Sequence, residues 1–207
     1  MKKSFALFIV LALLTLGANS QEADHSDYSG FALGVYNSNY FIIGDFANFA
    51  FITTGGEIDA EYTFPRFIPA NIDLGVSLRS QFNYVSANKN TTLKRDFELI
   101  PSLGLFLRIP FENNGCHLAF QPEVAFAYAL HFLQSDFGSP VSSFNADPGL
   151  LLSAGLRWDI PCEKNDSFEF ELAPVYLFAP ESRDFVVNQF GFRFGVIWHI
   201  QNFFQNR

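Results

Sequence analysis

Apolar and polar side chains alternate along most of this chain with a period of two. In one segment, Leu74, Val76 and Leu78 fall on one face, whereas Gly75 and Ser77 fall on the other. This alternation is typical of β-strands whose two faces meet different environments. The pattern predicts eight strands, at residues 28–36, 56–64, 71–85, 96–109, 117–130, 149–160, 168–178 and 190–200.

The apolar rows of these eight segments contain no charged residue, and Ser80 is their only clearly polar member. Three prolines, Pro101, Pro122 and Pro174, lie in the apolar rows. Proline has no backbone N–H to give to a strand ladder, so we expect β-bulges at these positions.

The connections between the predicted strands alternate in length. Short ones lie around residues 65–70, 112–115 and 161–166, and longer ones span residues 37–54, 86–95, 131–147 and 179–187. Asn114 and Gly115 favour a type I′ hairpin turn, which pairs Ile109 with Phe120. Short turns at one end and long loops at the other predict an antiparallel up-and-down arrangement.

Alternation alone is compatible with two kinds of closed barrel, because the apolar rows can face either lipid or an internal ligand cavity. In the second case the protein is a secreted, lipocalin-like ligand binder. The polar rows are rich in small residues and in opposite charges, as a narrow filled lumen requires, and Trp158, Trp198 and Phe168 gather near the short turns. The sequence therefore predicts an all-β fold, an eight-stranded antiparallel up-and-down transmembrane β-barrel.

The first residues have the features of an export signal. Lys2 and Lys3 precede an apolar stretch at residues 5–16, and Ala18 and Ser20 suit signal peptidase. We expect cleavage of a signal peptide at residues 1–20 and a barrel over residues 21–207. The 27 phenylalanines exclude a disordered chain. The net charge of −8 makes nucleic acid an unsuitable partner.

In strand number, loop asymmetry and face pattern, the chain resembles the small eight-stranded bacterial outer-membrane proteins of the OmpX, OmpW and OmpA-transmembrane type. The resemblance implies a monomeric barrel in the outer membrane, surrounded by outer-membrane lipid. One departure is the end of the chain, where such proteins usually finish on an aromatic residue. Here residues 201–207 follow the last apolar row and end on Arg207.

Charged residues of both signs occupy the predicted inward rows. We expect them to form a lumen ion-pair network, since buried charges must be paired, with a polar conduit as the alternative. If the turn at residues 163–166 pairs Ile160 with Phe168, Arg157 lies opposite Glu171. The predicted network comprises Arg79, Arg108, Glu123, Arg157, Glu171 and Arg193.

The two cysteines, Cys116 and Cys162, lie at the short-turn end of neighbouring predicted strands. A register centred on Ser139 sets them opposite each other on the same face. Because an exported protein enters an oxidising compartment, we predict a disulfide between them on the periplasmic side.

Nothing in the sequence indicates a metal or cofactor site. Among the histidines, only His131, near Ser135 and Asp136, lies where some barrel enzymes carry catalytic groups, and no triad spacing accompanies it. His117 and His199 are expected to be interior or interfacial polar groups. We therefore expect a non-enzymatic protein whose loops meet a surface ligand or host partner. The alternative is a narrow OmpW-like channel for small or apolar solutes.

Overall fold

The computed structural model describes the chain in separate stretches. These are residues 30–43, 47, 50–64, 72–87, 93–113, 116–135, 142–160, 167–179 and 187–200. Within them, no helix is both long enough and apolar enough to cross a membrane. The expected signal peptide and residues 201–207 lie outside the described part.

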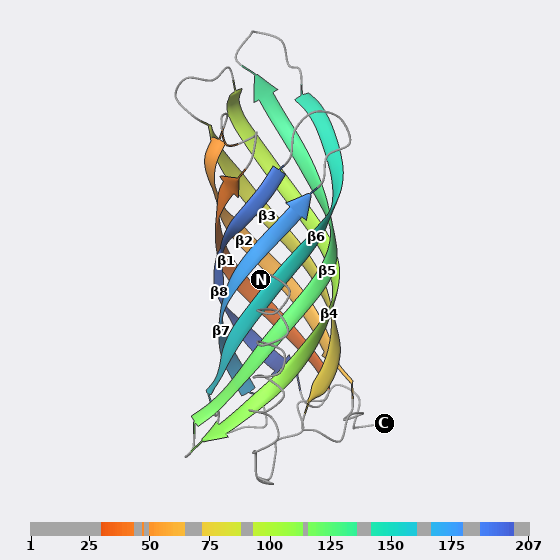
Figure 1. The fold of residues 1–207 in the computed structure, drawn as a ribbon, viewed down its shortest axis with the longest axis vertical. Coiled ribbons are helices and arrows are strands. Elements are labelled where there is room, and N and C mark those ends of the chain that lie inside the picture. The colour runs from red at the N-terminus through yellow and green to blue at the C-terminus, as the bar shows by residue number, and fades with distance from the viewer. Residues whose placement is uncertain are drawn as a thin grey trace, which may run out of the picture.

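Eight strands form one closed barrel. They are β1 (Gly30–Ile43), β2 (Ala50–Thr63), β3 (Asp73–Ala87), β4 (Leu93–Asn113), β5 (Cys116–Ser135), β6 (Ser142–Ile160), β7 (Ser167–Ala179) and β8 (Val187–Ile200). Each strand pairs antiparallel with its neighbours in sequence, and β8 pairs with β1 to close the sheet (Figure 1). A closed sheet has no unpaired edge, which is what a membrane-spanning sheet requires. The predicted eight-stranded up-and-down barrel is confirmed.

The two faces of the sheet differ sharply. Val35, Leu103 and Phe126 on the outside are 66%, 62% and 62% exposed, whereas Arg79 and Glu98 on the inside are 2% and 0% exposed. A ligand-binding barrel in water has the reverse arrangement, with its apolar rows inside. The lipocalin-like alternative is therefore wrong, and the apolar exterior makes this a transmembrane barrel.

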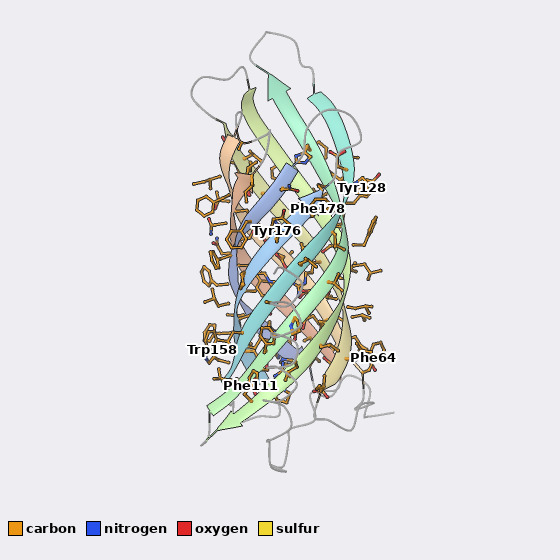
Figure 2. The ribbon with its side chains drawn as sticks, viewed as in Figure 1. Phe64, Phe111, Tyr128, Trp158, Tyr176 and Phe178 are labelled. Atoms are coloured by element: carbon orange, nitrogen blue, oxygen red, sulfur yellow. The ribbon has the colours of Figure 1, made fainter. Side chains whose placement is uncertain are left out.

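Aromatic side chains gather at both ends of the apolar surface. Phe168 and Trp198 stack near the short turns, with ring centroids 6.4 Å apart, which agrees with the girdle predicted there. A second group lies toward the long connections. Figure 2 shows Phe64, Phe111 and Trp158 at one end, and Tyr128, Tyr176 and Phe178 toward the other.

The hairpin register predicted from Asn114 and Gly115 is confirmed, because Ile109 pairs with Phe120 and Asn113 pairs with Cys116. The prediction of bulges at the prolines is wrong. On either side of Pro101, the β4–β5 ladder passes from Leu99–Leu130 to Ser102–Ala127 with its register unchanged.

Pro122 and Pro174 interrupt one ladder each in the same way. The described β6–β7 pairs resume from Ser153–Val175 to Leu156–Leu172 with the register kept. Each proline lacks a backbone N–H, which interrupts the ladder with only one of its two neighbouring strands. The register is unchanged across each proline, so no extra residue is inserted and no bulge forms.

Most long connections are shorter than predicted. β1 continues to Ile43 and β2 begins at Ala50, so most of the expected loop at residues 37–54 is strand. Most of the expected loop at residues 131–147 is also strand, and so is half of the one at residues 86–95. Apart from its two end residues, the expected loop at residues 179–187 lies outside the described part of the structure. The expected loop at residues 37–54 begins at Asn37 and Asn39, polar residues that stand in the outward row within β1, so the contrast between the rows fades there while backbone pairing continues.

The barrel rim is uneven at the long-connection end. β4, β5 and β6 contain 21, 20 and 19 residues, while the other strands contain 13 to 15. These three strands rise above their neighbours as a raised sheet (Figure 1). Below, "raised sheet" means the ends of β4, β5 and β6 next to residues 136–141 and 88–92.

A closed barrel with a satisfied backbone resists detergent until it is heated. We expect the unboiled protein in dodecyl sulfate to migrate faster on a gel than the boiled protein, because the folded barrel stays compact. The protein is also expected in the detergent-extracted membrane fraction. A water-soluble monomer that needs no detergent would contradict the transmembrane arrangement.

Candidate functional site

The six residues predicted for the lumen network come from six consecutive strands. Each is 5% or less exposed. Each has the parity opposite to the apolar row of its own strand, so its side chain points into the barrel. They are Arg79 on β3, Arg108 on β4, Glu123 on β5, Arg157 on β6, Glu171 on β7 and Arg193 on β8.

Arg157 and Glu171 face each other across β6 and β7, in the register set by the pair Ile160–Phe168. Arg157 Nε donates to Glu171 Oε2 at 2.7 Å. The same guanidinium donates to both carboxylate oxygens of Glu61 on β2, at 2.8 and 2.6 Å. Arg157 therefore joins one neighbouring strand to a strand across the lumen.

Arg193 makes the second junction. Its Nε donates to Glu171 Oε1 at 2.9 Å, so Glu171 links two arginines through its two oxygens. Its other nitrogens reach Glu57 Oε1 at 3.1 Å and Glu123 Oε2 at 3.4 Å. These contacts connect β8 to β7, β2 and β5.

Arg79 completes a ring of charges. It lies 2.7 Å from Glu123, 3.2 Å from Glu57 and 3.2 Å from Glu61, measured between nitrogen and carboxylate oxygen. Its Nε lies 3.2 Å from Asp59 Oδ2. Below, "central ring" means Arg79, Arg157 and Arg193 with the carboxylates of Glu57, Glu61, Glu123 and Glu171. The central ring connects β2, β3, β5, β6, β7 and β8.

The ring of Tyr36 on β1 lies within the central ring. Its centroid is 5.9 Å from the guanidinium carbon of Arg79 and 5.2 Å from that of Arg193, both cation–π distances. Its hydroxyl donates to Glu171 Oε2 at 3.5 Å. Gly34 and Gly195 leave room for the ring, since a Cβ on either would lie within 2.6 Å of a Tyr36 carbon. Tyr36 was not among the residues predicted for the lumen network, although the two inward glycines are a signal for it in the sequence.

Arg108 belongs to a separate cluster near the short turns. It donates through two nitrogens to both oxygens of Glu169, one of them at 2.8 Å. His199 Nε2 lies 2.7 Å from Glu169 Oε2, so His199 is an interior polar group, one of the two locations expected for it. Arg157 Nη1 lies 3.6 Å from Glu169, which links this cluster to the central ring.

A third polar cluster surrounds Glu98 toward the long connections. Glu98 accepts hydrogen bonds from Asn83 Nδ2 at 2.8 Å and from Gln189 Nε2 at 2.5 Å. His131 Nε2 lies 3.5 Å from its Oε1. His131 is 4% exposed, so it points into the barrel rather than standing at the rim as a catalytic group would. Asp136 lies outside the described residues.

Apolar side chains also fill part of the lumen, which the sequence analysis did not predict. Below, "apolar layer" means this inward cluster: Tyr40, Ile100, Ala125, Ala127, Ala129, Leu151, Ala173, Val175 and Leu177. All are 3% or less exposed. Because their parity is that of the charged rows, the lumen holds packed hydrophobic contacts next to its ion pairs.

The cysteine register predicted from Ser139 is wrong. Leu118 on β5 pairs with Trp158, whereas a register centred on Ser139 would pair it with Ile160. The strands are thus shifted by two positions, which preserves face parity. Cys162 and the side chain of Cys116 lie outside the described part of the structure, so the disulfide stays a prediction.

In the described part of the lumen, carboxylates are grouped chiefly with arginine cations. No group of three or more histidine, cysteine, aspartate or glutamate side chains there has a geometry that could hold a metal ion. The carboxylates of the central ring instead accept from guanidinium groups, which match them in geometry and charge.

The apolar exterior, the two aromatic girdles and the packed lumen define the class of protein: a small eight-stranded transmembrane barrel of the outer-membrane type. Neisserial surface protein A has a similar structure, with a TM-score of 0.51 and 10% identity, covering 83% of this chain and 97% of that one. The sequence-based resemblance is therefore confirmed at the level of the fold.

A second similar structure is that of Ail, the attachment invasion locus protein of Yersinia pestis, in complex with the heparin analogue sucrose octasulfate. Its TM-score is 0.48 and its identity 13%, covering 82% of this chain and 99% of that one. No protein-family model matches the sequence, and no curated protein aligns with it.

The central ring makes a direct prediction for Arg157. Arg157→Met removes the guanidinium between Glu61 and Glu171 and leaves both carboxylates buried. We expect the free energy of unfolding to fall by about 3–5 kcal/mol, the usual effect of removing one member of a buried ion pair. Adding Glu61→Gln and Glu171→Gln should restore part of this loss. Urea unfolding in lipid vesicles, followed by tryptophan fluorescence, measures it.

The matched control is Leu156→Met, one residue earlier on the same strand and on the lipid face. It should leave the unfolding midpoint unchanged. If Arg157→Met unfolds at the same urea concentration as the wild type, the central ring does not stabilise the barrel.

A second prediction concerns the space around Tyr36. In Gly34→Ala the added Cβ would lie 2.6 Å from Tyr36 Cε2, so the ring must shift, and we expect a loss of about 1–3 kcal/mol. Combining it with Tyr36→Leu should give less than the sum of the single effects. Gly56→Ala is the control, because its Cβ would meet its nearest atom at 3.6 Å. Additive effects would contradict the close packing.

Proposed function

We propose that the protein is an integral outer-membrane barrel that carries no catalytic activity and presents a surface for interaction or adhesion. The observation that carries this proposal is the filled lumen. The central ring links six strands through charged hydrogen bonds, and the apolar layer packs next to it. A barrel filled in this way serves as a rigid support rather than as a passage.

The raised sheet is the part of the described structure best placed to meet a partner. Its strands extend the barrel wall beyond the last pairs of β3 with β4, which end at Val85–Asp96, while β4 and β5 continue to Leu93–Ser135. At its base, where Phe97 still pairs with Tyr84 of β3, the outward rings of Phe97 and Phe132 lie with centroids 6.4 Å apart. A stiff wall fixes the strand ends from which the connections leave, and a rigid support lowers the entropy lost on binding.

The location supports the same proposal. The apolar exterior between two aromatic girdles fits a bilayer, and the features of residues 1–20 favour export. Outer-membrane lipid is thus the proposed partner of the belt, and a surface ligand or host molecule the proposed partner of the loops. The burial of His131 against Glu98 adds support for a non-enzymatic role.

Ion conduction distinguishes a filled barrel from a narrow channel. We expect purified protein in planar lipid bilayers to give no discrete conductance steps, because the central ring and the apolar layer occupy the lumen. Insertion is verified in the same preparation by heat-dependent gel migration. Discrete, reproducible openings from inserted protein would refute the filled lumen and establish the channel for small solutes.

A further inference from the structure

A group of polar side chains interrupts the apolar exterior of the barrel. Asn37 and Asn39 on β1 point outward and are exposed. On the same face of the same strand, Val35 at 66% exposed precedes them, and Phe41 and Ile43 at 45% and 47% exposed follow them. Because apolar residues lie on both sides along the strand, the two asparagines stand within the lipid-facing belt and not at its edge.

The neighbouring strands enclose the two asparagines in the same way. On β8, the exposed side chains of Phe194 and Phe192 pair with Asn37 and Asn39. On β2, Asn39 pairs with Thr54, another exposed polar residue. Among the described outward side chains, leaving aside tyrosines and Asn188 at the rim, the polar ones all lie on β1–β3, with Ser80 on β3 opposite Ile58 of β2. Below, "polar patch" means this group: Asn37, Asn39, Thr54 and Ser80.

Three members of the polar patch are connected by hydrogen bonds. Thr54 Oγ1 donates to Asn39 Oδ1 at 2.8 Å, and Asn39 Nδ2 donates to Asn37 Oδ1 at 2.7 Å. These bonds use two donors, although the two amides and the hydroxyl carry more donors than that between them. Hydrocarbon offers no acceptor, so polar groups at this depth are costly unless a partner bonds to them.

Within one copy of the barrel, the polar patch adds the bond from Thr54 to Asn39 between β2 and β1, two strands that are already joined by their backbone ladder. The lumen is packed by inward side chains, and a leucine or valine at the same positions would face lipid at lower cost. The patch also has no part in the proposed surface function, because it lies on the side of the wall. A partner within the membrane explains both its polarity and its position.

We propose that the polar patch is the contact between two copies of this chain in the membrane, related by a two-fold axis along the bilayer normal. Asparagine amides donate and accept, so the patch is complementary to itself, as a two-fold contact requires. A second copy also has the same orientation and depth, which places like residues at like heights. Interhelical amide bonds are known to join membrane segments in the same manner.

The shape of the surface beside the patch agrees with this symmetry. Protruding Phe194, 60% exposed, lies on the β8 side, while on the β2–β3 side the small residues Gly56 and Ser80 leave a low surface between the exposed side chains of Ile58 and Phe82. A two-fold axis through β1 brings the β8 side of one copy against the β2 side of the other. Each Phe194 then faces the low surface of the opposite copy. The proposal replaces the monomer expected from the sequence and depends only on the barrel spanning a membrane.

Disulfide cross-linking tests the contact without altering the patch. Both native cysteines are replaced by serine, and Val35→Cys is introduced beside the patch. Phe126→Cys on β5, 62% exposed against 66% for Val35, is the matched control on another face. The purified proteins are reconstituted at equal protein-to-lipid ratio in phosphatidylcholine vesicles and oxidised. We expect a covalent dimer from Val35→Cys and monomer from Phe126→Cys. Equal yields from the two would overturn the proposal.

A second variant separates a contact from a purely structural role. Asn37→Leu with Asn39→Leu, added to the Val35→Cys protein, should reduce cross-linking to the level of the Phe126→Cys control. Urea unfolding of the same variant should show no loss of barrel stability, since leucine suits lipid. Persistent cross-linking would show that the copies meet without the polar patch, and a destabilised barrel would show that the patch serves the fold. Either result would contradict the proposal.

Discussion

Eight strands enclose a lumen just wide enough for side chains to fill. This narrowness limits which side chains each inward position can hold. Most of the described inward side chains are buried, so the inward charges need partners close by. The arginines meet this need because one guanidinium can serve several carboxylates at once, as Arg79 does with Glu57, Asp59, Glu61 and Glu123. Residues without a side chain complete the fit, because Gly34 and Gly195 admit the ring of Tyr36.

The outward side chains follow the same alternation along each strand, but they are apolar where the inward rows carry charges. They are exposed in the structure yet apolar, which is coherent only if the surrounding medium is hydrocarbon. The hydrocarbon surroundings explain the many phenylalanines, because every second residue of an alternating strand faces that medium. Against this uniform background a few amides become informative. Asn37 and Asn39 would be unremarkable on a protein in water, whereas among Phe192, Phe194 and Phe41 they require an explanation.

Local information in the sequence predicts neighbours along the ladder but not contacts across the lumen. Face parity and the turn after Ile160 place Arg157 opposite Glu171, because both depend on residues close together in the chain. The bond from Arg157 to Glu61 depends on strand tilt and stagger summed around the barrel, which no single segment encodes. The apolar layer was missed for a related reason. Parity separates two faces, and it does not say that the inner face changes from charged to apolar along its length.

The central ring also supplies information that the hydrophobic pattern lacks. A slip of one residue between two strands turns apolar side chains inward and is strongly disfavoured. A slip of two residues preserves every face and therefore passes unnoticed by the apolar rows, as the two-position error in the cysteine register illustrates. Such a slip between β6 and β7 would separate Arg157 from Glu171 by two positions and leave buried charges unpaired. The ion pairs thus distinguish between registers that place the same side chains in lipid.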